Sequence, residues 1–404
     1  MRVGIILGTY AAVNILAVLL IDRWLCRSSR GYQRSVGARV IVCFVFAALA
    51  FMPVLAILID GNPYQYILLK YSYVWMGVKL YFGALLLIVS VIDMIAGFFM
   101  RKRKNEDDTD ESGGWRAVHA FIFILIIAAA VGINVYGTIH ARDTVVTHMD
   151  ATVNKQVKTV KKLRVALIAD FHISYNSDPR TIRKMVDKLN RQKPDVVFAA
   201  GDMFSSGYSS VKDPSEYIKA FRGIKAKEGV FWVYGNHDVE EPLFCGFGLD
   251  DSKNAVRTKK MVRFLKKSGF TILEDSFTAV AGGEVQIAGR ADLFKPTDKA
   301  KKRLDARKLL TDLDKEKPII VIEHEPDGYK ALAESGADIS MSGHTHAGQI
   351  FPGTIFTRLM NDVAYGKADR EGMQVFVTSG VGCYGPPLRI GTNSEIMIID
   401  ITFK

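Results

Sequence analysis

The sequence predicts an α/β domain joined to a membrane region, and two observations lead to this fold class. Long apolar runs dominate the residues before about 140, whereas short apolar runs alternate with charged helical stretches after that point. Of the 404 residues, 49% are hydrophobic, a fraction that indicates membrane segments. We therefore expect a transmembrane region over residues 1–140, a juxtamembrane linker or edge strand over 141–159, and a folded domain over 160–404.

Four apolar runs have the length of a membrane span, and they cover about residues 3–21, 40–59, 80–100 and 118–137. Each is close to the ~20 residues that cross a hydrocarbon core about 30 Å thick. They are apolar on all sides, whereas a helix in a globular core normally keeps a polar stripe. The aromatic tract from Tyr64 to Tyr81 is expected to be an interfacial stretch that leads into the third span.

The loop charges predict an orientation for these spans. Arginines follow the first run, a basic cluster over 101–104 follows the third, and the loop between the second and third runs is poor in positive charge. Because basic loops stay in the cytoplasm, the N-terminus and everything after the fourth run should lie on the opposite side. Asp93 lies inside the third run, where it is either a functional group or a residue near a helix end that reaches toward the interface.

The charge and the cysteines narrow the classes of partner. The net charge of +11 fits nucleic acid, anionic lipid or a negatively charged substrate. Nucleic-acid binding is not expected, because the chain has no basic stripe interleaved with aromatic residues. The four cysteines lack the spacing of a cysteine metal site. Outside the cytoplasm, Cys245 and Cys383 would either pair or remain as two thiols.

Metal-binding residue types follow five apolar runs of the second half, each at the point where a predicted strand ends. The segments are IADFH with Asp170 and His172, AAGD with Asp202, YGNHD with Asn236, His237 and Asp238, VIEHEPD with His324, and SGHTHAGQ with His344 and His346. Five of the eight histidines of the chain lie in these segments. In α/β folds the loops beyond the carboxyl ends of strands gather into one site. Carboxylate, amide and imidazole ligands without thiolate suit Mn²⁺, Fe or Zn²⁺.

Each of these motifs alone has an ordinary structural explanation, such as an aspartate that caps a helix or an Asn-His turn. Their joint occurrence after successive strands, next to Gly201, Gly235 and Gly343, is what indicates a site. Glycine lets the backbone turn sharply and brings neighbouring side chains close to a bound ion.

The ordered set D-x-H, G-D, G-N-H-D, H and G-H-T-H resembles the calcineurin-like metallophosphoesterases over about residues 160–402. The ending GHTHAGQ with SGVGCYGPPLRIGTNSEI resembles the bacterial membrane-associated branch, although Ala169 and Ala347 stand where glycine or serine is frequent. The resemblance implies a four-layer α/β/β/α sandwich of two mixed sheets that holds two divalent ions. Together with the four apolar runs and the loop charges, it leads us to expect a multi-pass protein of a bacterial inner or plasma membrane, with the catalytic domain extracytoplasmic.

The resemblance further assigns a role to each polar residue. It implies that Asp170, His172 and His346 bind the first ion, that Asn236, His324 and His344 bind the second, and that Asp202 bridges them. His237 would then face the substrate without binding metal, with Asp238 orienting it. Two such cations lower the pKa of a shared water and clamp the phosphoryl oxygens. His237 would donate a proton to the leaving oxygen.

We therefore expect a membrane-anchored phosphoesterase that acts on phosphomonoesters or diesters, with lipid-linked esters among the candidates. Arg389 is a candidate substrate contact, because a guanidinium fork fits phosphate oxygens, with a surface arginine as the alternative. The apolar loop of Phe244, Phe247 and Leu249 either dips toward the bilayer or packs within the protein.

Three alternative functions remain open at this stage. The domain could bind metal and a phosphorylated ligand without catalysis and report through the four helices. It could hydrolyse lipid-linked pyrophosphates while facing the cytoplasm, as a branch of the resembled family does. Nuclease action is a third alternative, which the four spans and the absence of a basic groove disfavour.

Overall fold

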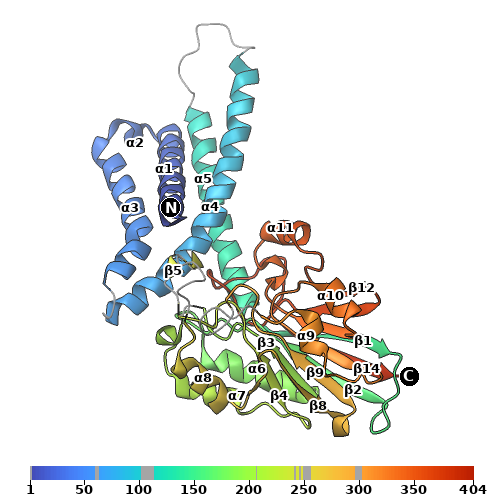
Figure 1. The fold of residues 1–404 in the computed structure, drawn as a ribbon. Coiled ribbons are helices and arrows are strands. Elements are labelled where there is room, and N and C mark those ends of the chain that lie inside the picture. The colour runs from blue at the N-terminus through green and yellow to red at the C-terminus, as the bar shows by residue number, and fades with distance from the viewer. Residues whose placement is uncertain are drawn as a thin grey trace. The chain divides into compact units, whose positions relative to one another are not determined.

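The computed structural model describes residues 2–59, 63–101, 113–205, 207–240, 243–244, 247–248, 256–295 and 303–404. The chain divides into two compact units, Met1–Tyr136 and Gly137–Lys404. The first unit is helical, and the second contains the sheets (Figure 1).

The first unit consists of long apolar helices. They are α1 (Arg2–Ser28), the short α2 (Arg30–Arg34), α3 (Val36–Leu58), α4 (Pro63–Arg101) and α5 (Gly113–His140). Among the described residues, four segments are long and apolar enough to cross a membrane: Gly4–Ser28, Val36–Ala56, Tyr64–Phe99 and Gly114–His140. This confirms the four apolar helices expected from the sequence.

Two details of the first unit differ from the sequence-based expectation. The first helix continues to Ser28, so the arginines at 23 and 27 lie within it and not in a loop. The aromatic tract from Tyr64 to Tyr81 is continuous with the third span, because α4 is one helix of 39 residues. The two lysines of that tract interrupt the apolar pattern without interrupting the helix.

Polar contacts connect three helices of this unit. The indole of Trp24 on α1 donates to Oγ of Ser90 on α4 at 2.6 Å. Asp93, one turn further along α4, accepts a hydrogen bond from Arg27 of α1 and lies 3.2 Å from Nε2 of His119 on α5. An ionisable residue in a span is normally found with partners from neighbouring helices, and Asp93 has them on both sides.

The first sheet of the second unit has the order β1-β14-β2-β3-β4-β7. Its strands are β1 (Val145–Val153), β2 (Lys162–Ile168), β3 (Val196–Ala200), β4 (Val230–Val233), β7 (Thr271–Ile272) and β14 (Glu395–Phe403). β14 is antiparallel to β2, whereas β2, β3, β4 and β7 run parallel to one another. β1 forms an edge and pairs with β14 over its whole length.

The second sheet has the order β12-β13-β11-β10-β9-β8. Its strands are β8 (Ser276–Val280), β9 (Val285–Gly289), β10 (Ile319–Ile322), β11 (Ile339–Ser342), β12 (Gly366–Arg370) and β13 (Met373–Val377). The four central strands are parallel and the two outer ones antiparallel. Both sheets are therefore mixed, as expected.

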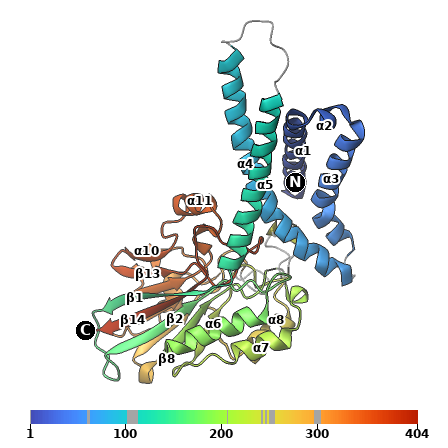
Figure 2. The same cartoon turned by 180° about the vertical axis from the view of Figure 1, so that it is seen from behind.

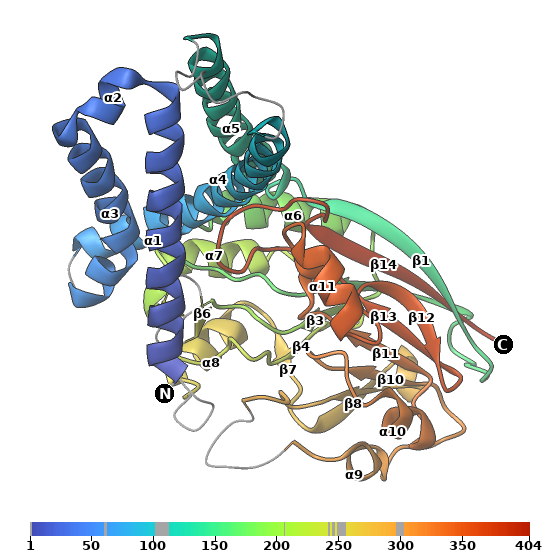
Figure 3. The same cartoon turned by 90° about the horizontal axis from the view of Figure 1, so that it is seen from above.

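Three hydrophobic cores separate four layers. Residues from both sheets, such as Phe198 and Phe376, share the central core. The outer face of the first sheet packs against α6 (Pro179–Arg191), α7 (Pro214–Phe221) and α8 (Lys259–Lys267). The outer face of the second packs against α9 (Ala306–Leu310) and α10 (Tyr329–Glu334). Figures 2 and 3 show these two groups of helices on opposite sides of the sheets, which confirms the α/β/β/α sandwich.

The helix α6 illustrates how the sequence sets these elements. Asp178 caps it by accepting from the amide of Arg180, and proline occupies the first turn, where no amide donor is needed. The helix buries four apolar residues at helical spacing: Ile182, Met185, Val186 and Leu189. Burial of each such side chain contributes about 1.5–3 kcal/mol, which fixes α6 on the first sheet.

The remaining elements are short. They are the hairpin β5 (Leu243–Phe244) and β6 (Phe247–Gly248), the 3₁₀ turns η1 (Tyr208–Ser210), η2 (Ala281–Gly283) and η3 (His346–Gly348), and α11 (Gly353–Met360). Cys245 and Leu249 lie outside the described residues. The expectations on a Cys245–Cys383 pair and on an apolar loop around residue 249 therefore stay predictions.

Candidate metal centre

The predicted metal ligands lie just beyond the carboxyl ends of five parallel strands. Asp170, Asp202 and Asn236 follow β2, β3 and β4 of the first sheet. His324 and His344 follow β10 and β11 of the second. Because neighbouring parallel strands end at the same edge, both sheets contribute to one place.

The backbone at these positions is held in an unusual conformation. Five candidate ligands have a positive φ: Asp170 (56°), His172 (45°), Asp202 (58°), His344 (71°) and His346 (49°). A non-glycine residue in the left-handed region costs about 1–2 kcal/mol. Strain of this kind is typically retained where side chains must converge on a functional site.

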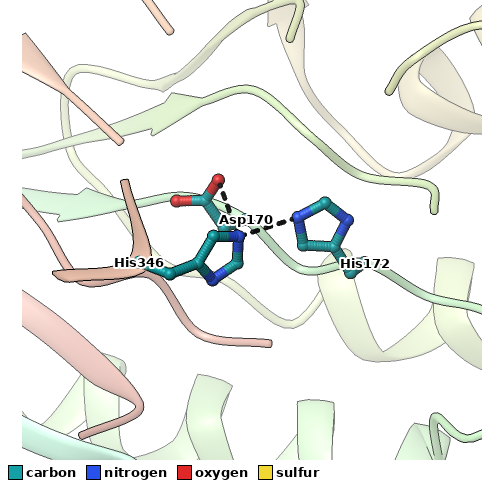
Figure 4. A group of neighbouring side chains, drawn as sticks. All are labelled: Asp170, His172 and His346. Atoms are coloured by element: carbon teal, nitrogen blue, oxygen red, sulfur yellow. Dashed lines mark hydrogen bonds and ion pairs between the residues drawn. The ribbon is translucent and has the colours of Figure 1, made fainter. Parts of the chain in front are cut away.

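The first cluster consists of Asp170, His172 and His346 (Figure 4). The Nε2 atoms of the two histidines are 3.0 Å apart, and Nε2 of His346 is 3.6 Å from Oδ1 of Asp170. All three residues are buried. The amide of His344 donates to both oxygens of Asp170 at 3.1 Å, which fixes that carboxylate.

The second cluster consists of Asn236, His324 and His344. Oδ1 of Asn236 is 3.1 Å from Nε2 of His324 and 3.0 Å from Nδ1 of His344, and these two nitrogens are 3.2 Å apart. Nδ1 of His324 lies 2.7 Å from the carbonyl oxygen of Ala200. A carbonyl only accepts, so Nδ1 carries a proton and Nε2 of His324 is the ring nitrogen that faces the other donors.

Asp202 is shared by the two clusters. Its Oδ2 lies 3.5 Å from Nε2 of His172 and 3.1 Å from Nε2 of His324. Its Oδ1 accepts from the amide of His237 at 2.8 Å. The carboxylate therefore faces both groups of nitrogen donors, with its orientation set by a backbone contact.

Glycines provide the room for this convergence. A Cβ atom on Gly235 would lie 2.2 Å from Oδ1 of Asp202, and one on Gly343 would lie 2.6 Å from Oδ2 of Asp170. Neither position can accept a side chain without moving a carboxylate. The glycines of the G-N-H-D and G-H-T-H segments are therefore required by close approach.

The donor set fits divalent cations. Ligand atoms at about 2.0–2.2 Å from a common ion lie roughly 3.0–3.6 Å apart, which is the spacing within each cluster. Burial lowers the pKa of His172 to about 3 and that of His344 to about 4, so both imidazoles are neutral and able to bind metal. Burial also raises the pKa of Asp170 to about 7. A bound cation would lower this pKa again, because it stabilises the ionised carboxylate.

The sequence model of the calcineurin-like phosphoesterase family matches residues 163–348. A transmembrane protein with a metallophosphoesterase domain from Danio rerio is 30% identical over 349 residues, which cover 84% of this chain and 74% of the zebrafish protein. The chain belongs to the calcineurin-like phosphoesterase family.

A bacterial relative also matches this chain. An uncharacterised metallophosphoesterase of Campylobacter jejuni is 28% identical over 255 residues, 63% of each chain. This chain therefore spans less than two thirds of that relative. Among solved structures, the NAD nucleotidase of Haemophilus influenzae overlaps with a TM-score of 0.36 and 17% identity, over 55% of this chain and 46% of that one. An overlap of this extent adds nothing to the assignment.

Asp238 of this family member does not have the position expected of a group that orients His237. Its two oxygens accept from the amides of Asp202, Met203, Phe204 and Gly235 at 2.8–3.4 Å. A carboxylate has about four acceptor positions, and these amides account for them. Asp238 therefore holds together the two loops that carry Asp202 and Asn236.

His237 lies half-exposed at the edge of the first cluster. Its ring centroid is 5.5 Å from that of His172 and 4.4 Å from that of Tyr384, with 31° between the His237 and Tyr384 planes. The ring is thus beside the clusters and reachable from solvent. Tyr384, which the sequence did not single out, forms one wall of the site through contacts with both histidines.

Arg389 is not a substrate contact, because its side chain is completely buried. The guanidinium donates to the carbonyl oxygens of Ser379 at 2.7 Å and Gly382 at 2.7 Å, and more weakly to that of His346 at 3.5 Å. These contacts join the loop after β13 to the G-H-T-H segment. The arginine therefore positions the first cluster through its contacts with backbone carbonyl groups. It is neither of the expected alternatives, a substrate contact or a surface residue.

A buried acidic pair next to the second cluster was also missed. Glu325 offers an oxygen that lies within 4.8 Å of ligand atoms of His324 and His344. Glu325 and Asp292 are 2% and 1% exposed, and burial together with the neighbouring Glu325 raises the pKa of Asp292 well above its usual value. Among the residues that the structure describes, Oε1 of Glu325 and Oδ2 of Asp292 have no hydrogen-bond partner. The only sequence signal was that Glu325 directly follows a predicted ligand.

Proposed function

We propose that this protein is a membrane-anchored phosphoesterase that holds one divalent ion in each cluster, with Asp202 shared between the two ions. The observation that supports this most directly is the position of Asp202 Oδ2, which lies within 3.5 Å of histidine nitrogens from both clusters. Ions bound there would supply an activated water and neutralise the oxygens of a phosphoryl group.

The protein's own residues have three tasks in this proposal. The seven donors hold the ions, and the strained backbone at five of them keeps the donors converged before the ions arrive. His237 lies outside both clusters yet close to the first, so its ring is placed to give a proton to the leaving oxygen of a substrate. The ring of Tyr384 restricts the orientation of His237.

The four apolar helices favour a substrate at the membrane, and we propose a lipid-linked phosphomonoester or diester. The basic loops after the first and third spans place the domain outside the cytoplasm in this proposal. A reporter fused to the C-terminus that is active only outside the cytoplasm tests the topology. Cytoplasmic reporter activity would instead favour the hydrolysis of lipid-linked pyrophosphates on that side.

The central experiment uses the full-length protein in detergent, loaded separately with Mn²⁺, Zn²⁺ or Fe²⁺. We expect hydrolysis of bis(4-nitrophenyl) phosphate or 4-nitrophenyl phosphate to depend on the metal, and to stop with a chelator. Elemental analysis should find close to two ions per chain. Two bound ions without hydrolysis of either ester would favour the non-catalytic binding function instead.

A further inference from the structure

The helix α11, which follows the G-H-T-H segment, exposes an apolar face. None of its eight residues is buried. The exposed fractions are 49% for Ile355, 60% for Phe356, 78% for Leu359 and 82% for Met360. Their spacing of i, i+1, i+4 and i+5 places these four residues, the apolar face of α11, on one side of the helix.

The polar residues of α11 lie on the inner side, which is the reverse of a helix that faces water. Thr354 and Thr357 are both half-buried. A Cβ atom on Gly348 would lie 2.5 Å from Cα of Thr354, so the first turn packs directly against η3. A helix on a soluble domain normally turns its apolar stripe inward and its threonines outward. This inversion indicates that the apolar face of α11 is covered by an apolar phase.

The chain connects the domain that carries α11 directly to a membrane-type helix. The last membrane-type helix ends at His140, and β1 begins at Val145. The intervening residues 141–144 span at most about 14 Å when extended. In addition, Nε2 of His140 is hydrogen-bonded to the carbonyl oxygen of Thr392 at 3.1 Å, and the carbonyl oxygen of Gly137 accepts from the amide of Arg389. The end of that helix is therefore part of the phosphoesterase domain, which cannot move far from the bilayer.

We propose that α11 lies in the interface of the lipid bilayer with its apolar face inserted below the headgroups. Helices of this kind bury their apolar side about 5–10 Å into the boundary between headgroups and acyl chains. Arg358, which is exposed on the same helix, is long enough to reach from there to lipid phosphates.

The docked helix would set the depth of the metal centre. The segment between His346 and the start of α11 at Gly353 is short. Hydrogen bonds hold it in place: the amide of Phe351 donates to the carbonyl oxygen of Ile390 at 3.0 Å, and the amide of Gly353 donates to that of Ile350 at 2.6 Å. His346 thus stays close to the interface, at the level of a lipid phosphoester. This consequence rests on the proposed function, whereas the docking of α11 does not.

Lipid contact can be tested without measuring catalysis. The full-length protein is reconstituted in phosphatidylglycerol–phosphatidylcholine nanodiscs, with a diazirine amino acid in place of Leu359 or Phe356. A matched control carries it in place of Lys330 on α10, whose side chain is 74% exposed. We expect lipid adducts by mass spectrometry from positions 359 and 356 and none from position 330. Adducts with a second copy of the chain, adducts with water alone, or equal lipid labelling at position 330 would overturn the proposal.

A second measurement separates docking from catalysis. In the double variant Leu359→Asp, Met360→Asp, we expect kcat/KM for a phosphoester embedded in vesicles to fall roughly tenfold or more, because apolar side chains no longer enter the interface. The kcat/KM of the same variant for soluble bis(4-nitrophenyl) phosphate should be unchanged. An equal loss for both substrates would overturn the interfacial role of α11. If neither substrate is hydrolysed by the unaltered protein, the proposed function fails while the labelling result still decides the docking.

Discussion

Oδ2 of Asp202 lies 3.1 Å from Nε2 of His324, and this pair joins the end of β3 in the first sheet to the end of β10 in the second. The two strands belong to different sheets of the sandwich. The contact therefore depends on how the sheets pack, and a cation shared at this point would stabilise the packing of both.

We predict that Asp202→Asn lowers the metal content from about two ions to less than one. The amide keeps an oxygen that can accept from the amide of His237, so the loop should remain folded, but it removes the negative charge that faces both clusters. Elemental analysis of the full-length protein measures the change. Asp187→Asn on the exposed side of α6 is the control and should keep both ions. Full occupancy in Asp202→Asn would contradict a shared ligand.

Gly235→Ala should have a similar effect by a steric route. The new methyl group would lie 2.2 Å from Oδ1 of Asp202, so the carboxylate has to leave its position. Gly83→Ala on α4, where no atom of the described residues lies within 4 Å of the added methyl group, controls for expression and detergent handling. Isothermal titration with Mn²⁺ should show at least tenfold weaker binding only in Gly235→Ala. Unaltered binding in that variant would mean that the site tolerates displacement of Asp202.

Arg389→Met tests whether this arginine positions the first cluster. The substitution removes the guanidinium donor from the buried carbonyl oxygens of Ser379 and Gly382, which should lower the free energy of unfolding by about 3 kcal/mol. Hydrogen exchange should increase at residues 346–348 and 379–382. Arg370→Met is the matched control, because Arg370 pairs with Asp362 at the surface, where water screens the pair, and its loss should change the stability much less. Equal stability losses in the two variants would refute the positioning role.

The sequence predicted which polar residues lie close together better than it predicted their surroundings, and the reason is physical. A strand followed by a glycine and a metal-binding residue type is a local pattern, so Asp202, Asn236 and His344 could be recognised one segment at a time. The environment of Arg389 depends on carbonyl oxygens of a loop brought in by β13 and β14, which no local pattern reveals. Asp238 was misjudged for the same reason, since its partners are backbone amides of another loop.

The fold likewise was predictable in its local elements and not in its long-range pairings. Helix-forming and strand-forming segments followed from periodicity, whereas the pairing of β1 with β14 joins segments from opposite ends of the domain. The first and third helices extend beyond the apolar runs 3–21 and 80–100, because α1 continues through Arg23 and α4 runs through Lys70 and Lys79. A charged side chain near a helix end can extend toward water without ending the helix.

His237→Ala should separate metal binding from turnover. The ring lies outside both clusters, so the variant should keep its ions, while loss of a proton donor to the leaving oxygen should lower kcat by about 10²- to 10⁴-fold. The loss should be smaller for an ester of a more acidic alcohol, because such a leaving group needs less protonation. A comparison of 4-nitrophenyl and phenyl phosphodiesters measures this difference. The same loss for both esters, or a loss of metal, would contradict the assigned role.

Glu325→Gln tests whether the buried acidic pair supports the second ion. Oε2 of Glu325 accepts from the amide of Leu293 at 3.1 Å, whereas Oε1 has no hydrogen-bond partner within the described part of the chain. If its charge stabilises an ion held by His324 and His344, neutralisation should weaken the binding of one ion by about 10- to 100-fold and leave the other unchanged. The exposed Glu316→Gln provides the control for a lost surface charge. Two unaltered affinities would show that Glu325 and Asp292 interact only with each other and the backbone.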